Sequence, residues 1–160
     1  MSSKPIETLI AAFPNTAWKL LSHAENTQQN ITAFEFTELQ GCNQFIFTGD
    51  WAANSAGYSG VDININGVWV IGAGTYFVHP SQHKYATITL NLLPGKRIWY
   101  SGMSATINEP YNQDGLNVGV IVPIPNMAES IISINFNLHN ASTSILAGAN
   151  YALYGRVDDV

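Results

Sequence analysis

Residues 145–157 read Ile-Leu-Ala-Gly-Ala-Asn-Tyr-Ala-Leu-Tyr-Gly-Arg-Val, and this stretch decides the fold class. Gly148 allows a sharp turn, because glycine adopts the positive φ angles that other residues avoid. The run Tyr-Ala-Leu-Tyr then forms a short aromatic strand in which Tyr151 and Leu153 share one face, and Gly155 ends it. A strand of this kind, pinned between two glycines near the last residue of the sequence, is predicted to be the closing strand of an all-β domain.

Most of the chain after residue 30 alternates between apolar and polar residues with a period of two, as half-buried strands do. The clearest case is 61–66, where Asn66-Gly67 separates the alternating run from a second apolar one and predicts a tight hairpin. We therefore predict an antiparallel β-sandwich of the jelly-roll type. Its expected strands cover 31–36, 44–48, 61–66, 68–71, 85–92, 98–102, 118–122, 131–138 and 151–154.

The first residues carry helix signals instead. Ser3 is a capping residue, Pro5 falls in the first turn, and Pro14 stops the segment, so a short helix or arm is expected over 3–13. The predicted organisation is an N-terminal arm or short helix over residues 1–29, followed by one β-sandwich domain over residues 30–160.

Composition excludes several classes of function. Only 11% of the residues are charged and the formal net charge is −5, with six scattered basic residues and no basic stripe, so nucleic-acid binding is excluded. No apolar run is long enough to span a bilayer, so no membrane insertion is expected, and residues 1–5 lack the pattern of a signal peptide. The single cysteine, Cys42, fits synthesis in a reducing cytoplasm and is expected to be a buried strand thiol.

Two patterns suggest metal sites, but neither supplies a complete set of ligands. Residues 62–67 match the opening of an EF-hand loop, but the position of its bidentate Glu is occupied by Ala73, and Ile63 and Ile65 alternate as in a strand. His79 and His83 have a spacing that zinc could use, but no third ligand lies near them in the sequence. We predict no metal and no cofactor.

No catalytic motif is present either. The sequence has no G-x-S-x-G nucleophile elbow, P-loop or H-E-x-x-H. Dispersed carboxylates leave a glycoside-hydrolase pair open, but nothing points to one. The prediction is that the protein is not an enzyme.

Aromatic residues in or beside predicted loops suggest glycan contacts, because sugars stack their apolar C–H faces on aromatic rings. For Trp69 and Trp99, which lie within apolar runs, packing in the core is the favoured alternative. Trp51 is the best candidate for exposure. The candidate glycan-contacting residues are Trp51, Tyr58, Trp99, Tyr100 and Tyr111.

Three motifs, in this order along the chain, resemble small β-rich bacteriophage virion proteins. They are the paired runs 31–39 and 45–49, the hairpin segment 61–69, and the run 131–136 followed by the Gly-x-x-Tyr-x-Leu-Tyr-Gly ending at 148–155. The match covers roughly residues 30 to 157. Each motif is short, and it is their order that carries the resemblance.

The resemblance implies a homotrimeric virion protein, made in the host cytoplasm and assembled into the particle. Its expected partners are copies of itself, the major capsid protein or another virion protein, and a host surface glycan as a further candidate. Because the sequence starts at Met1 without a fibrous shaft, capsid decoration (a cement or head-spike role) is preferred to a receptor-binding tail tip. A glycan-binding lectin is the competing class, and a glycan-cleaving enzyme is the weakest.

Overall fold

The computed structural model describes residues 17–28, 30–39, 41–54, 59–78, 83–95, 97–106, 113–123, 131, 133–140 and 143–157. Every helix or strand within these residues is a β-strand, which confirms the predicted all-β class. The predicted helix over 3–13 lies outside the described residues.

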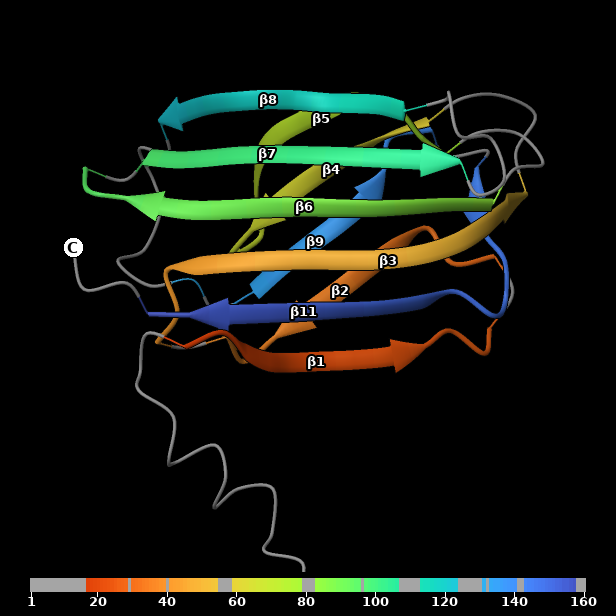
Figure 1. Ribbon diagram of the computed structural model, residues 1–160, viewed down its shortest axis with the longest axis horizontal. Helices are drawn as coiled ribbons and strands as arrows, with labels where there is room; N and C mark the ends of the chain where they lie inside the picture. The colour runs from red at the N-terminus through yellow and green to blue at the C-terminus, as the bar shows by residue number, and fades with distance from the viewer. Residues whose placement is uncertain are drawn as a thin grey trace, which may run out of the picture.

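Within these described ranges, eleven strands form two antiparallel sheets (Figure 1). The large sheet has the order β1-β11-β3-β6-β7-β8, with β10 pairing to the end of β3, and the small sheet has the order β2-β9-β4-β5. The strands are β1 Lys19–Glu25, β2 Ala33–Thr37, β3 Gln44–Asn54, β4 Ser59–Ile65, β5 Val68–Val78, β6 His83–Leu93, β7 Arg97–Thr106, β8 Gln113–Pro123, β9 Ser133–Leu138, β10 Ser144–Ile145 and β11 Asn150–Arg156.

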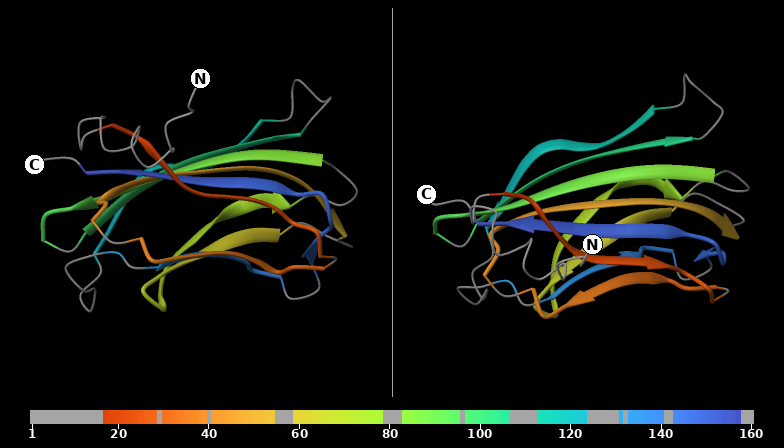
Figure 2. Two further views of the ribbon diagram at one scale, coloured as in Figure 1. Left: turned by 90° about the horizontal axis from the view of Figure 1, so that it is seen from below. Right: turned by 60° about the horizontal axis from the view of Figure 1, so that its bottom comes forward.

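The two sheets lie face to face (Figure 2). Aromatic side chains fill the space between them. Phe47 of β3 stacks on Phe136 of β9 with ring centroids 4.4 Å apart, and Phe34 of β2 meets Tyr151 of β11 at 4.6 Å. Each buried aromatic side chain contributes about 1.5–3 kcal/mol through its burial. The contact between the sheets is therefore the main source of stability.

The closing strand is confirmed, but it does not lie at the edge of its sheet. β11 is hydrogen-bonded between β1 and β3. Tyr151 and Leu153 share one face as predicted, and this face is the one that packs in the core. Gly148 has a φ of 92°, and its N–H donates to the Asn26 carbonyl at 2.7 Å. After this turn the chain runs between β1 and β3, two strands from the first third of the sequence.

Gly155 does not end the strand, contrary to prediction. It lies within β11, paired with Lys19 and Phe45, and the strand continues to Arg156. A Cβ at this position would lie 2.5 Å from Leu21 Cδ1. The missing side chain at this position leaves room for the Leu21 and Cys42 side chains, and the glycine does not mark a turn.

The sandwich begins earlier than the predicted boundary at residue 30. β1 pairs along β11 from Lys19 to Glu25, so the first strand belongs to the large sheet. A bulge between Leu20 and Ser22 interrupts the alternation, leaving Leu20 exposed while Leu21 packs against the core. Because a bulge breaks the period of two, the sequence pattern did not reveal this strand.

The Asn66-Gly67 hairpin between β4 and β5 is confirmed. Both turn residues have positive φ angles, 51° and 76°, as a type I′ turn requires. The turn is also tied to β9, because the Asn66 side-chain Oδ1 accepts a hydrogen bond from the Ser133 N–H at 3.1 Å. The hairpin is therefore fixed relative to the small sheet.

Replacing Gly155 with alanine should lower the free energy of unfolding by about 1–3 kcal/mol, the usual cost of overpacking. The added methyl group would overlap Leu21 Cδ1, and it would lie 2.9 Å from Cys42 Sγ. Urea unfolding measures the loss. The Leu21→Ala variant provides the control: the double variant should lose less than the sum of the two single losses, because the shortened side chain leaves room. Strict additivity would contradict this account.

Cys42 precedes β3, half-buried against the core, instead of lying in a strand as predicted. Burial raises the pKa of its thiol above the ordinary value, and nearby Lys19 partly opposes the shift by lowering it. A raised pKa means less thiolate near neutral pH, so the folded protein should react with a disulfide reagent several-fold more slowly than the unfolded chain. Lys19→Gln should slow the reaction further; faster labelling in that variant would contradict the assignment.

Candidate functional site

The candidate sites lie on the two outer faces of the sandwich. We call the outward side of β1, β11, β3, β6 and β7 the large-sheet face, and the outward side of β2, β9, β4 and β5 the small-sheet face. Because side chains in a strand alternate between faces, the residues exposed on each are fixed by the register of the buried ones. The predicted glycan-contacting residues can therefore be placed one by one.

Trp51 is not a loop residue, and the prediction that it is exposed is wrong. It is 0% exposed, on the inward side of β3, with its ring 5.4 Å from that of Phe34. β3 continues through Gly49 to Asn54, whereas the predicted strand ended at residue 48. A Cβ on Gly49 would lie 3.0 Å from Trp51 Cζ3, so the absent side chain makes room for the indole ring.

The remaining candidates do not converge on one site. Tyr100 is 3% exposed and faces the core from β7, so its assignment as a glycan contact is wrong. Trp99 beside it, for which packing in the core was favoured, points outward instead and is half-buried, paired across the sheet with Asn91 and Ile121. Tyr58 and Tyr111 lie outside the described residues.

For Trp69 the error is the reverse of that for Trp51: a buried side chain was predicted, and an exposed one is found. It was expected to fill the core, but it is 62% exposed at the start of β5. Its direct cross-strand partner is Asn64, a residue on the outward side of β4, so the ring belongs to the small-sheet face. The signal available in the sequence was its place two residues after the hairpin turn, where a strand has only just begun.

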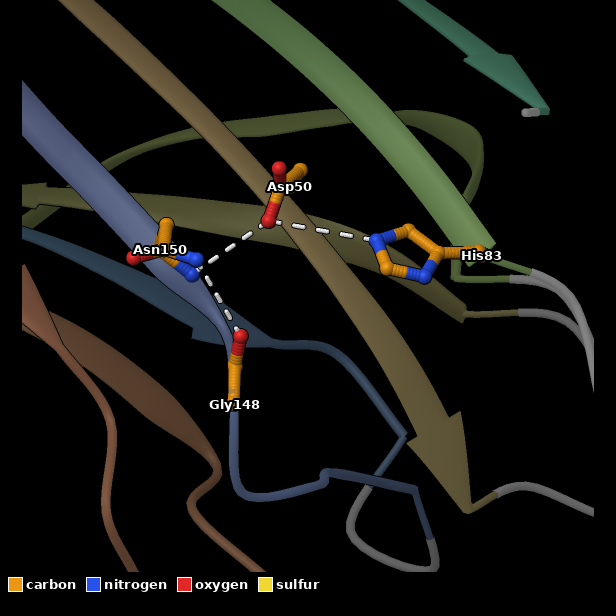
Figure 3. Close-up of polar contacts among 4 residues, drawn as sticks. All are labelled: Asp50, His83, Gly148 and Asn150. Atoms are coloured by element: carbon orange, nitrogen blue, oxygen red, sulfur yellow. Dashed lines mark hydrogen bonds and ion pairs between the residues drawn. The ribbon is translucent and has the colours of Figure 1, made fainter.

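Polar groups gather at one end of the large-sheet face (Figure 3). Asp50 of β3 lies between its neighbours: its Oδ1 accepts a hydrogen bond from the Asn150 N–H at 3.4 Å and lies 3.8 Å from His83 Nε2. The Asn150 side chain donates a hydrogen bond from its Nδ2 to the Gly148 carbonyl at 3.3 Å. The cluster joins three strands, β11, β3 and β6, and it holds one carboxylate, whereas a glycoside hydrolase needs a pair.

A second polar region lies on the small-sheet face. Asp62 of β4 is outward, and its Oδ2 lies 3.0 Å from His139 Nδ1 at the end of β9. The part of residues 62–67 that suggested an EF-hand is thus a strand followed by a hairpin turn. Within the described residues, no three His, Cys, Asp or Glu side chains lie close enough to hold a metal ion, and His79 lies outside them.

An open polar cavity of about 550 Å³ lies between the end of β1 and β2, with Glu25 and Glu35 in its lining. The side chain of Asn26, also in the lining, is engaged in hydrogen bonds within the protein. Its Nδ2 donates to the Gln28 and Leu146 carbonyls, at 2.6 Å and 3.3 Å. Its Oδ1 accepts from the Gln28 N–H at 3.0 Å. The side chain therefore holds the chain between β1 and β2 in place, and the cavity is a product of this connection.

Lys84 is a residue that sequence reasoning did not single out. It is 1% exposed on the inward side of β6, opposite Trp51 on β3. A lysine in a period-two strand reads as an outward residue, and only the register with β3 turns it inward.

No protein-family model matches the chain, and no curated protein or solved structure is significantly similar to it. In the described part of the chain, no helix has the length and apolar character needed to cross a membrane.

Proposed function

We propose that this protein is a non-enzymatic structural protein of a bacteriophage virion, a homotrimeric capsid decoration protein of the cement or head-spike type. The strand order supports it. The order β1-β11-β3-β6 in one sheet and β2-β9-β4-β5 in the other suits the jelly roll that we propose for this sandwich, with β7 and β8 extending the first sheet. Jelly rolls occur in viral capsid and lectin domains, so this order suits a virion protein but does not by itself choose between those two roles.

The observation that carries the proposal is the uncharged centre of the large-sheet face. Two rows of outward residues cross this sheet, and neither contains Asp, Glu, Lys or Arg. One row is Leu20, Tyr154, Ile46, Thr89 and Ser101; the other is His23, Ala152, Thr48, Thr87 and Met103. Leu20 and Met103 are more than half exposed.

Such a face suits contact between identical copies. A chain with a net charge of −5 repels itself, and repulsion is weakest where the approaching surfaces carry no charge. Sheet faces that remain in water usually carry more polar and charged side chains than these rows do. The proposed trimer therefore has the large-sheet face at its interface, with closed cyclic symmetry.

Light scattering coupled to gel filtration should give a mass of three times 17.4 kDa, about 52 kDa. Thr89→Lys should shift the mass toward the monomer, because it places a charge at the centre of the uncharged row. Thr37→Lys is the matched control: it makes the same change on an exposed residue of β2 and should leave the trimer intact. A monomer for the unaltered chain, or equal effects of both variants, would refute the assignment.

The position in the virion distinguishes decoration from the second candidate, a receptor-binding tail tip. Immunogold electron microscopy of the phage that encodes the protein should label the head surface. Its gene should likewise neighbour that of the major capsid protein. Labelling of the tail end, with the gene among tail genes, would replace decoration with receptor binding.

A further inference from the structure

Trp69 exposes an indole ring that the core does not use. It is 62% exposed on the small-sheet face, and Val68 beside it is also exposed. A single exposed aromatic side chain is ordinary on a protein surface, so its meaning depends on its neighbours.

The neighbours of Trp69 form a row of polar side chains across the small sheet. Asn64 lies directly opposite it, Asn135 follows on β9, and Glu35 follows on β2. Strands lie about 4.8 Å apart, so Trp69 and Asn135 are separated by about 10 Å along the row. The ring therefore borders a flat strip of amide and carboxylate groups.

A second polar row runs beside the first. Asn137 of β9 pairs with Asp62 of β4, and Asp62 is in contact with His139. Two side-chain amide atoms of these rows, Asn135 Oδ1 and Asn137 Nδ2, are buried and have no hydrogen-bond partner among the described residues. Because these two atoms are shielded from a ligand on the surface, the polar side chains available to one are the partly exposed Asn64 and Asp62 and the exposed Glu35.

We infer that the small-sheet face binds a neutral oligosaccharide, with one pyranose ring stacked on Trp69 and hydrogen-bonded to Asn64, and the neighbouring ring lying beside Asn135. The C–H face of a pyranose is apolar and packs on an indole ring, while its hydroxyl groups both donate and accept hydrogen bonds. A side-chain amide offers the same pair of functions in one group. Asn64, directly opposite Trp69, lies within reach of the edge of a ring stacked on the tryptophan. Asn135, one strand further along the row, lies at the distance of the next ring of an oligosaccharide.

The charge of the face selects the class of sugar. The four strands of the small sheet contain no Lys or Arg, whereas Asp62 and Glu35 are outward. An anionic sugar would meet like charges without a basic partner, so uronic acids, sialic acids and sulfated sugars are disfavoured. The ligand is an oligosaccharide of neutral hexoses or N-acetylhexosamines.

Screening the whole protein on an array of neutral and acidic glycans tests the class, and tryptophan fluorescence during titration with the strongest neutral hit tests the site. Chitotetraose, cellotetraose and lactose are the first soluble probes, with tetragalacturonate as the acidic counterpart. Binding should be confined to neutral glycans. Trp69→Ala should weaken it about tenfold or more, and Trp69→Phe, which keeps a ring, should weaken it less.

Thr37→Ala is the control, because it truncates an exposed side chain on the same small-sheet face, outside the row of Trp69 and outside the proposed trimer interface. It should retain the affinity of the unaltered protein, and thermal melting should show that both variants are folded. Trp69→Ala should also leave the oligomer mass unchanged, which separates this inference from the proposed trimer.

Three outcomes would overturn the inference. One is an array on which no neutral glycan binds, and another is a Trp69→Ala variant with unaltered affinity. The third is resistance of Trp69 fluorescence to acrylamide quenching, measured as the difference between the unaltered protein and Trp69→Phe. Such protection would mean that a second copy covers this face.

Discussion

The stack of Phe47 on Phe136 joins the two sheets, and the remaining structure follows from it. The two rings come from β3 and β9, residues far apart in the sequence, and their centroids lie 4.4 Å apart. For them to meet, the two strands must lie at one level with these side chains inward. The period of two then fixes which residues face outward on both sheets. The chemistry of each outer face is thus a consequence of aromatic packing in the interior.

Local signals in the sequence were sufficient for the elements that depend on neighbouring residues alone. The Asn66-Gly67 turn and the closing strand after Gly148 follow from backbone preferences, and both are present. β1 was missed because its bulge breaks the alternation, and because its pairing partner, β11, lies at the other end of the described chain. Gly155 was read as a strand end, although its role is set by Leu21, a contact that no local pattern encodes.

The candidate site was harder to predict than the fold, for a related reason. Alternation tells which residues share a face, but it does not tell which face meets the other sheet. Trp51 was placed in a loop because Gly49 was read as a break, whereas that glycine makes room for the indole ring inside the sandwich. Trp69 was placed in the core because its neighbours are apolar, whereas it shares the outward side with Asn64. Both errors concern side-chain direction, which only the register between strands determines.

The two outer faces differ in the chemistry that the register leaves on them. The central rows of the large-sheet face combine aliphatic and hydroxyl side chains without charged residues, while the small-sheet face carries amides, carboxylates and an exposed indole ring. Since the faces lie on opposite sides of the sandwich, copies that pack through their large sheets would direct their small sheets away from the shared axis. Three copies would then present three equivalent Trp69 strips outward. A weak sugar contact at each strip would gain strength through simultaneous binding to a surface that displays many sugars. Self-association through one face and sugar recognition through the other are therefore compatible. The trimer would bring three weak sugar contacts together, which would strengthen binding to such a surface.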